Sequence, residues 1–334
     1  MDADSIMVKD ENHTNIILQI KNLSVHFETI DKRLNVLKNV NLKIKKGEVV
    51  GIVGESGSGK STLAQAIVGV LDSPPAFIEN GEIIFDGEKI YPMINKKFNY
   101  RGKGINMVFQ EPIVSLNPVY TVRKQIEEAL DVAGESKDKQ VRETFIKNTL
   151  KDLMIRDLDR VLKSYPHQLS GGMRQRVAIG MAIIQKPKLM ILDEPTTGLD
   201  LIVQRQILKL LLDLREKVDT SLIIITHDLT VAATVCDKIY VMYTGGIVES
   251  APKVNIIDNS MHPYTQMLRN SVPMGYFDHG PLNVSDGSPP DLSNLPSGCT
   301  FHPRCQKRMD KCTRMVPPMK QIDEDNEVAC WLYE

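Results

Sequence analysis

The first part of the chain is rich in patterns typical of β-strands. Residues 16–20 and 23–27 are predicted to form two early strands, and apolar and polar residues alternate along 23–27 and along 36–44. Alternation with a period of two is typical of a strand that buries one face. With a further strand and turn at 83–87, these stretches predict an antiparallel β-layer.

More continuous apolar runs follow. Residues 49–53 are mostly apolar and β-favouring, and residues 189–192 and 222–225 are wholly apolar. Such runs are typical of strands that are buried on both faces of a parallel sheet. The other expected elements here are a strand at 105–110, a crossover helix at about 202–218, and a hairpin of 239–243 with 246–249.

A charged, helix-favouring segment interrupts the strands from about residue 122 to about residue 162. Its apolar residues recur at helical spacing, which predicts an all-helical insertion. A further helix is expected to open at 169–175 and to run to about residue 185. We therefore place a helical subdomain at about 115–185.

Prolines punctuate the chain after about residue 251, where periodic apolar runs are few. This composition predicts a loop-rich extension with one helix near 263–270. We therefore expect a main domain over 1–250 and a C-terminal extension over 251–334.

A glycine-rich loop lies between the apolar run at 49–53 and a predicted helix. It fits the pattern G-x-x-x-x-G-K-[ST] of a phosphate-binding loop, in the strand-to-helix context that this pattern requires. Successive backbone N–H groups and the helix N-terminus would face the phosphates. Lys60 would reach the β- and γ-phosphates and Ser61 would help to hold Mg²⁺. The expected nucleotide-binding residues are Gly54, Glu55, Ser56, Gly57, Ser58, Gly59, Lys60, Ser61 and Thr62.

Composition and charge narrow the class of protein. The 334 residues are 42% hydrophobic and 25% charged, which is ordinary for a globular protein, and the formal net charge is −1. Nothing in this balance favours nucleic-acid binding. No apolar run approaches the roughly 20 residues that span a bilayer, and the acidic N-terminus lacks a signal-peptide core. We expect an intracellular protein that meets a membrane only through a partner.

Polar residues follow several predicted buried strands. Asp193 and Glu194 end the strand at 189–192, where the first would hold Mg²⁺ and the second would polarise a water, although such a pair can also cap a helix. His227 follows the strand at 222–225 and would sense a γ-phosphate, although a lone histidine is more often structural. Gln110 ends the strand at 105–110, where glutamine is usually only solvated.

Taken together, these motifs resemble those of ATP-binding-cassette ATPases over about residues 16–249. Gln110, the segments 169–175, 192–195 and 198–200, and His227 occur in that family's order. The resemblance implies a fold with a parallel-sheet core, an antiparallel β-layer and a helical subdomain. It implies ATP and Mg²⁺ as ligands and a head-to-tail dimer of ATPase subunits.

The same resemblance assigns individual roles. Gln110 would touch Mg²⁺ and the catalytic water, Glu194 would be the general base, and His227 would be the switch histidine. Lys60 completes the catalytic set. The signature residues Ser170, Gly171, Gly172 and Gln175 would contact ATP on the partner subunit, Asp200 would be the D-loop residue, and Phe27 would stack on adenine unless it is a core aromatic.

A narrower resemblance involves the loop and the tail. Residues 110–118, 262–266 and 299–305 look like segments of the oligopeptide/dipeptide permease subfamily. Glu111 and Gly198 depart from the usual residues, but neither is a catalytic group.

Four of the five cysteines lie in the tail. Cys299, Cys305, Cys312 and Cys330 follow the pattern C-x5-C-x6-C-x17-C, whereas Cys236 lies alone in an apolar segment as a small buried hydrophobe. Four thiolates suit a [4Fe–4S] cluster or Zn²⁺, and the close C-x2-4-C pairs common in structural zinc sites are absent. The subfamily resemblance favours the iron–sulfur cluster over zinc or free thiols.

We therefore expect an ATP-hydrolysing subunit of a membrane importer of peptides, lying at the cytoplasmic face of the membrane. It would pair with a paralogous ATPase subunit and two transmembrane permease subunits, and indirectly with an extracellular solute-binding protein. The cargo could instead be an oligosaccharide or a metal chelate. A soluble cassette ATPase that remodels nucleic-acid complexes is the alternative of another class.

Overall fold

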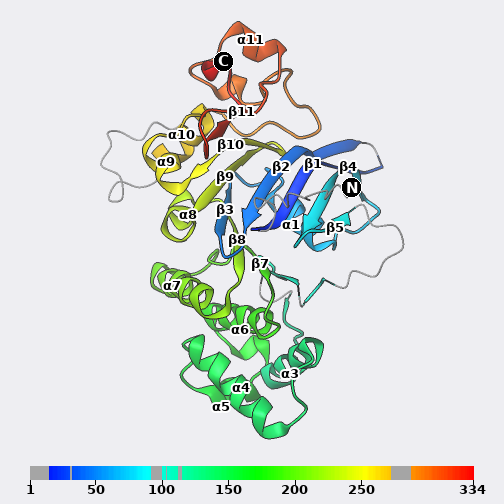
Figure 1. Cartoon of the computed structure of the whole chain (residues 1–334), viewed down its shortest axis with the longest axis vertical. Helices are drawn as coiled ribbons and strands as arrows, with labels where there is room; N and C mark the ends of the chain where they lie inside the picture. Colours follow the sequence, from blue (N-terminus) through cyan, green and yellow to red (C-terminus); the bar gives the residue numbers. More distant parts are fainter. Residues whose placement is uncertain (1–14, 31, 92–99, 103, 112–114, 272–286) are drawn as a thin grey trace, which may run out of the picture.

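The protein is described from a computed structural model, whose described residues are 15–30, 32–91, 100–102, 104–111, 115–271 and 287–334. The acidic N-terminus and part of the loop after Gln110 lie outside these residues. Two sheets occupy the middle of the molecule, with a helical subdomain at one end of its long axis and the C-terminal extension at the other (Figure 1).

The expected antiparallel β-layer is confirmed as a four-stranded sheet of order β2-β1-β4-β5. Its strands are β1 (Ile16–Glu28), β2 (Arg33–Lys45), β4 (Ala76–Phe85) and β5 (Glu88–Tyr91). The prediction of two early strands was wrong, because 16–20 and 23–27 belong to the single strand β1. A register shift between Ile20 and Leu23, with Asn22 at φ 51°, interrupts the pattern of this strand. The interruption made one strand look like two in the sequence.

The second sheet has the order β11-β12-β10-β9-β3-β8-β7-β6. Its central strand β3 pairs in parallel with β8 and β9, and β7 pairs in parallel with β8 and β6. The expected hairpin is confirmed as β9 and β10, which pair antiparallel. The bounds are β3 (Val49–Val53), β6 (Ile105–Val108), β7 (Leu189–Asp193), β8 (Ser221–Thr226), β9 (Lys238–Tyr243) and β10 (Gly246–Pro252).

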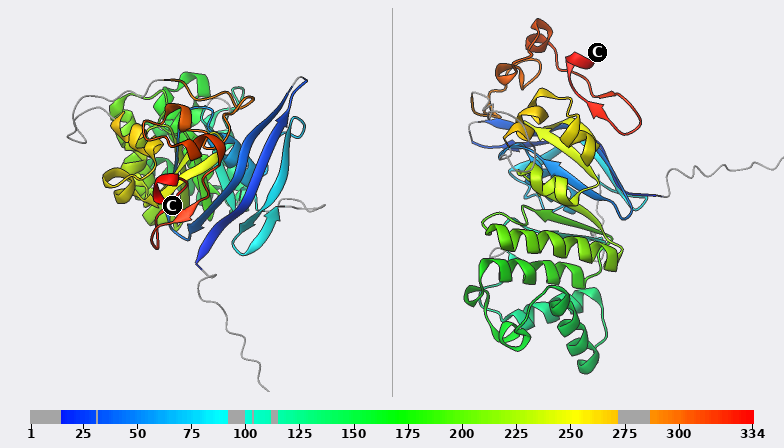
Figure 2. Two further views of the ribbon diagram at one scale, coloured as in Figure 1. Left: turned by 90° about the horizontal axis from the view of Figure 1, so that it is seen from above. Right: turned by 90° about the vertical axis from the view of Figure 1, so that its left-hand side faces the viewer.

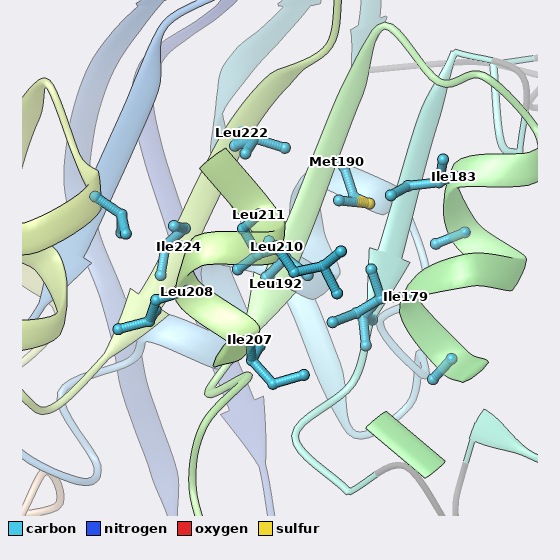
Figure 3. Packing of buried hydrophobic residues seen from close by; sticks show 14 of the residues in the cluster. Ile179, Ile183, Met190, Leu192, Ile207, Leu208, Leu210, Leu211, Leu222 and Ile224 are labelled. Carbon is cyan, nitrogen blue, oxygen red and sulfur yellow. The ribbon is translucent and has the colours of Figure 1, made fainter. Parts of the chain in front are cut away.

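Successive residues of the buried strands face opposite sides of this sheet, as the period of a strand requires. Met190, Leu192, Leu222 and Ile224 join a core with α6 (Gly171–Ile184) and α7 (Leu201–Val218) (Figure 3). The intervening residues, such as Ile191 and Ile223, face a second core with α1 (Lys60–Val68) and the antiparallel sheet. The helix α8 (Leu229–Val235) and the buried Cys236 also belong to the first core.

The helical insertion is confirmed by α3 (Val122–Ala133), α4 (Lys139–Asp152) and α5 (Leu158–Lys163). Side chains begin all three helices: Thr121, Asp138 and Asp157 each accept a backbone N–H bond as N-caps. A short 3-10 turn at Pro166–Gln168 leads from this subdomain into α6.

The C-terminal extension is attached to the main sheet. The predicted helix at 263–270 is confirmed as α10 (Pro263–Asn270), and short elements accompany it (Figure 2). The strand β12 (Glu327–Val328) pairs with β10 and with β11 (Lys320–Gln321). The chain's last two strands therefore add to one edge of the sheet that contains β3. The remaining elements are α9 (Lys253–Asp258), α11 (Asp310–Arg314), and 3-10 turns at His302–Arg304 and Trp331–Tyr333.

Candidate nucleotide site

The glycine-rich loop joins the buried strand β3 to α1. Gly57 and Gly59 adopt φ values of 78° and 99°, in the left-handed region that favours glycine. A Cβ at Gly59 would also lie 2.8 Å from the carbonyl oxygen of Val36. The loop therefore needs glycine here, both for its conformation and for its close approach to β2.

Lys60, the first residue of α1, is 5% exposed. Its Nζ donates hydrogen bonds to the carbonyl oxygens of Gly54 and Glu55, at 2.8 and 3.0 Å. Burial lowers the pKa of Lys60, and the carboxylates of Glu194, Asp193 and Glu55 oppose that shift. The lysine thus spans the loop at the place where a nucleotide's phosphates would bind.

Asp193 ends β7 and is 3% exposed. The hydroxyl of Ser61 donates a hydrogen bond to this carboxylate, while burial raises its pKa. Its Oδ1 has no hydrogen-bond partner. A buried carboxylate oxygen without a partner beside a hydroxyl is a donor set that suits Mg²⁺, so the predicted pair of Ser61 and Asp193 fits this cation.

The carboxyl ends of β7 and β8 are neighbours in the sheet, and this brings Glu194 and His227 together. Nδ1 of His227 lies 2.7 Å from Oε2 of Glu194, which also accepts a bond from the hydroxyl of Thr197. Glu194 is 8% exposed, whereas the His227 side chain is 53% exposed. The carboxylate is therefore held from both sides at the edge of the site.

The alternative interpretation of Asp193 and Glu194 as a helix cap is wrong. The next helix, α7, begins at Leu201, and its N-cap is Asp200, which accepts N–H bonds from Ile202 and Val203 at 3.0 Å. The predicted D-loop residue therefore has a structural role that is independent of any partner.

The signature motif begins α6. Ser170 is its N-cap and accepts the N–H of Met173 at 3.3 Å, and Gly171 and Gly172 form the first turn. Ser170 is exposed, so the N-terminus of this helix is open to a second molecule. Gln175 differs: it is 3% exposed, and its amide nitrogen has no partner. The structure thus does not present Gln175 at the surface with the other signature residues.

Two other predicted residues lie near strand ends. The strand expected at 105–110 is shorter than predicted, because β6 ends at Val108. Gln110 is exposed in the loop after β6, the neighbour of β7. Residues 112–114 of the same loop lie outside the described part of the chain. Phe27 lies near the end of β1 and is half-buried against the core that contains β3. Its contact with adenine stays a prediction.

Sequence reasoning missed three residues that hold the site. Thr197 bonds Glu194, and both Tyr264 and Arg304, from the C-terminal extension, bond Glu55 of the phosphate-binding loop. Only Thr197, three residues after the motif carboxylate, has a signal in the sequence, since its spacing to Glu194 permits a local turn.

The four tail cysteines line one small cavity together. Burial raises the pKa of Cys299 to about 11 and also raises the pKa of Cys305 and Cys330. Across the described residues, however, no group of three or more His, Cys, Asp or Glu side chains is arranged to hold a metal ion. The thiols share a cavity but do not form a preformed metal site.

Comparisons with known proteins agree with this architecture. The family model described as "ABC transporter" matches residues 37–197, and the model for the oligopeptide/dipeptide transporter C-terminal region matches residues 248–312. The fold is similar to a solved dimeric structure of the ATP-binding cassette MJ0796 bound to ADP and Pi, with a TM-score of 0.63 and 29% sequence identity. The matched region covers 71% of this chain and 99% of the MJ0796 chain.

Full-length relatives are more similar still. The oligopeptide transport ATP-binding protein OppD of Bacillus subtilis is 42% identical over 318 residues, which cover 95% of this chain and 88% of that protein. The dipeptide transport ATP-binding protein DppD of Escherichia coli is 40% identical over 315 residues, covering 94% and 96%.

The fold and the site define a P-loop ATPase of the ATP-binding-cassette class, in which Lys60, the Asp193–Glu194 pair and His227 lie together near the carboxyl ends of β3, β7 and β8. The extension narrows this class further. The chain belongs to the family of oligopeptide/dipeptide ABC transporter ATP-binding proteins. In the described part of the chain no helix has the length and apolar character needed to cross a membrane.

Proposed function

We propose that this ATPase powers the import of peptides through a membrane transporter. The observation that carries the proposal is the Glu194–His227 pair beside Lys60 and Asp193, in a chain that also has the peptide-transporter type of extension. Its relatives are described as oligopeptide and dipeptide transport ATP-binding proteins. The same subunit type serving an oligosaccharide or a metal chelate differs from this proposal only in cargo.

The site supports hydrolysis by positioning and charge. Lys60 and the loop N–H groups would bind the phosphates, and Ser61, Asp193 and Gln110 would hold Mg²⁺, which neutralises the phosphate charge. Glu194 would accept a proton from the attacking water as its oxygen bonds the γ-phosphorus, and the bond to ADP then breaks. His227, already at Oε2 of Glu194, would orient the carboxylate and the transferred group.

The second half of the site would come from a partner. Ser170, Gly171 and Gly172 offer N–H donors at the start of α6, away from the loop that serves this chain's own nucleotide. We infer a head-to-tail heterodimer with a paralogous ATPase subunit, in which Asp200 lies at the subunit contact. Two transmembrane permease subunits would bind the loop after Gln110 at the cytoplasmic face of the membrane. An extracellular solute-binding protein would act indirectly, and nucleic acid would have no part.

The experiment is reconstitution of the chain with its paralogue and permease subunits in lipid vesicles. We expect the subunits to co-purify in detergent and ATP hydrolysis to rise when solute-binding protein is added with a peptide. Stimulation by an oligosaccharide or a nickel chelate alone would contradict the cargo. Full activity without permease subunits, stimulated by nucleic acid, would contradict the transporter itself.

For the tail we propose a [4Fe–4S] cluster as the ligand of Cys299, Cys305, Cys312 and Cys330, with Zn²⁺ as the competing ligand. Their shared cavity supports this proposal, and the thiols would have to close around the group. Anaerobically purified protein should show a broad absorbance band in the visible blue with about four irons per chain. Stoichiometric zinc without that band would contradict the cluster.

A further inference from the structure

The C-terminal extension reaches the phosphate-binding loop through one ion pair. The guanidinium of Arg304 donates two hydrogen bonds to the carboxylate of Glu55, from Nη1 at 2.7 Å and from Nη2 at 2.9 Å. The Arg304 side chain is 7% exposed and that of Glu55 is 26% exposed. Such a paired, bidentate geometry in a poorly solvated place is far stronger than a surface ion pair.

Contacts with β9 and with the extension itself fix the position of this guanidinium. Nη1 of Arg304 lies 3.4 Å from the hydroxyl of Tyr243, and its guanidinium carbon lies 5.7 Å from the ring centre of Phe301. The Arg304 N–H donates to the carbonyl of Phe301, within the turn that precedes Cys305. The arginine therefore moves only with the cysteine-bearing turn.

Other contacts hold the same loop from the same side. The N–H of Glu55 donates to the hydroxyl of Tyr264, on α10, at 2.8 Å. The N–H of Gly245 donates to the carbonyl of Ser58 at 2.9 Å. The extension and the β9–β10 turn thus both hold the phosphate-binding loop, at Glu55 and at Ser58.

Charge makes the ion pair matter for nucleotide binding. The Glu55 carboxylate acts on Lys60 through its charge, as Glu194 and Asp193 do. Without Arg304, an uncompensated carboxylate would compete with the phosphates for Lys60 and would repel them directly.

We propose that Arg304 is a positioning residue for nucleotide binding: by neutralising and fixing Glu55, it makes the affinity for ATP depend on the folded extension. The proposal rests on ATP binding at the loop that begins with Gly54. It holds for any ligand of the cysteines, because the contact is made by Arg304 itself. It gives the extension a role within each nucleotide-binding event.

The test measures ATP affinity of the full chain with a fluorescent ATP analogue and ATP competition. Arg304→Gln should weaken ATP binding about tenfold, since it leaves an unpaired carboxylate near the phosphates. Adding Glu55→Gln in the same chain removes that carboxylate and should restore affinity to within about threefold of the original protein. In steady-state hydrolysis the single variant should raise KM far more than it lowers kcat.

The matched control is Lys311→Gln, which breaks another ion pair of the extension, with Glu334, that does not reach the loop. Its ATP affinity should be unchanged. Arg304→Lys keeps the charge without the fork and should weaken binding less than Arg304→Gln, which gives a second variant should the glutamine variant fail to fold.

A folded Arg304→Gln variant that binds ATP normally would overturn the proposal. So would a loss that Glu55→Gln does not restore, because that result marks a purely structural role. Absence of ATP binding by the original protein would instead contradict the proposed function.

Discussion

The charged residues of the nucleotide site depend on one another. Lys60 is buried and donates to two loop carbonyls, and the nearby carboxylates of Asp193 and Glu194 favour its charged form. A buried lysine without such partners would tend to lose its proton. The site is therefore an arrangement of opposite charges in which the ionisation of Lys60 depends on the carboxylates around it.

Glu194→Gln tests the role of the general base. The amide keeps the size of the side chain but cannot accept the proton of water, so kcat should fall by at least about 100-fold while ATP binding persists. The measurement is phosphate release alongside nucleotide affinity. Unchanged phosphate release would contradict the assignment, and Glu135→Gln, which removes a surface ion pair with Lys186 in the helical subdomain, is the control.

Residues close in sequence to a motif were predictable, and residues far from it were not. Strand-end positions identified Asp193, Glu194 and His227, because parallel strands bring their carboxyl ends to one edge. Arg304 lies 249 residues from Glu55, and no spacing rule connects them. The family resemblance placed Gln175 against the ATP of a partner subunit, a contact that stays a prediction for a side chain that is buried on α6.

At the scale of elements, long patterned segments were predicted well and short ones were missed. Helices α6, α7 and α10 lie close to the expected ranges. Strands β7 and β8 do so because a continuous apolar run is typical of a strand that is buried on both faces of a parallel sheet. The two-residue strands β11 and β12 and the five-residue helix α11 carry too few positions for any period. The strand β12 forms on the edge of β10, and β11 pairs with β12 in turn, which is tertiary information.

The start of α10 contains a buried titratable pair. His262 is 2% exposed, its ring Nδ1 accepts the backbone N–H of Tyr264, and its backbone N–H donates to the buried carboxylate of Glu249. Burial lowers the pKa of His262 to about 3 from an ordinary 6.5. The folded protein therefore holds this histidine neutral at pH values where the unfolded chain protonates it.

This depression makes the stability depend on pH in a definite direction. Stability from the neutral His262 is fully present above its unfolded pKa of 6.5 and is lost progressively as pH falls toward about 3. Between about pH 7.5 and about pH 5 the loss should be about 2 kcal/mol, measured by urea unfolding.

His262→Phe supplies the comparison. It should be less stable at pH 7.5, since the acceptor for the Tyr264 N–H is lost, but its stability should fall less steeply on acidification. The raised pKa of the Glu249 carboxyl, caused by burial, acts in both proteins and has the opposite sign, since it disfavours the folded state as pH rises. Parallel pH profiles for the two proteins would contradict a neutral His262.

At the scale of the molecule, one sheet connects the strand before the nucleotide loop to the strands of the C-terminal extension. The β3 strand ends in the loop, and β9, β10 and β12 continue from it to the last residues of the chain (Figure 1). The extension is thus a layer on the cassette, joined by backbone pairing as well as by Arg304. The signature helix begins elsewhere, at the junction with the helical subdomain.

Because the signature residues lie away from the phosphate-binding loop of the same chain, a substitution among them should affect the nucleotide of the partner subunit. A Cβ at Gly171 meets only Leu199 at 3.5 Å, an ordinary contact, whereas one at Gly172 would lie 2.6 Å from Val203. Gly171→Asp is thus tolerated by packing, yet it places a negative charge where a partner's γ-phosphate would bind. We expect this chain's own ATP affinity to stay within about twofold, while hydrolysis of the partner's ATP falls more than about tenfold.

Phosphate release is measured for heterodimers in which only one of the two ATP sites can turn over. Gly171→Asp is combined with a paralogue whose own catalytic glutamate is either intact or replaced by glutamine. With Glu194→Gln in this chain, only the partner's nucleotide can turn over, and Gly171→Asp should then lower the remaining phosphate release more than about tenfold. Gly171→Ala is the control for size without charge and should retain most of it. If Gly171→Asp instead weakened nucleotide binding to this chain, the helix would serve its own site, because a donor set acts on the charge it faces. The heterodimer would then not be the catalytic unit.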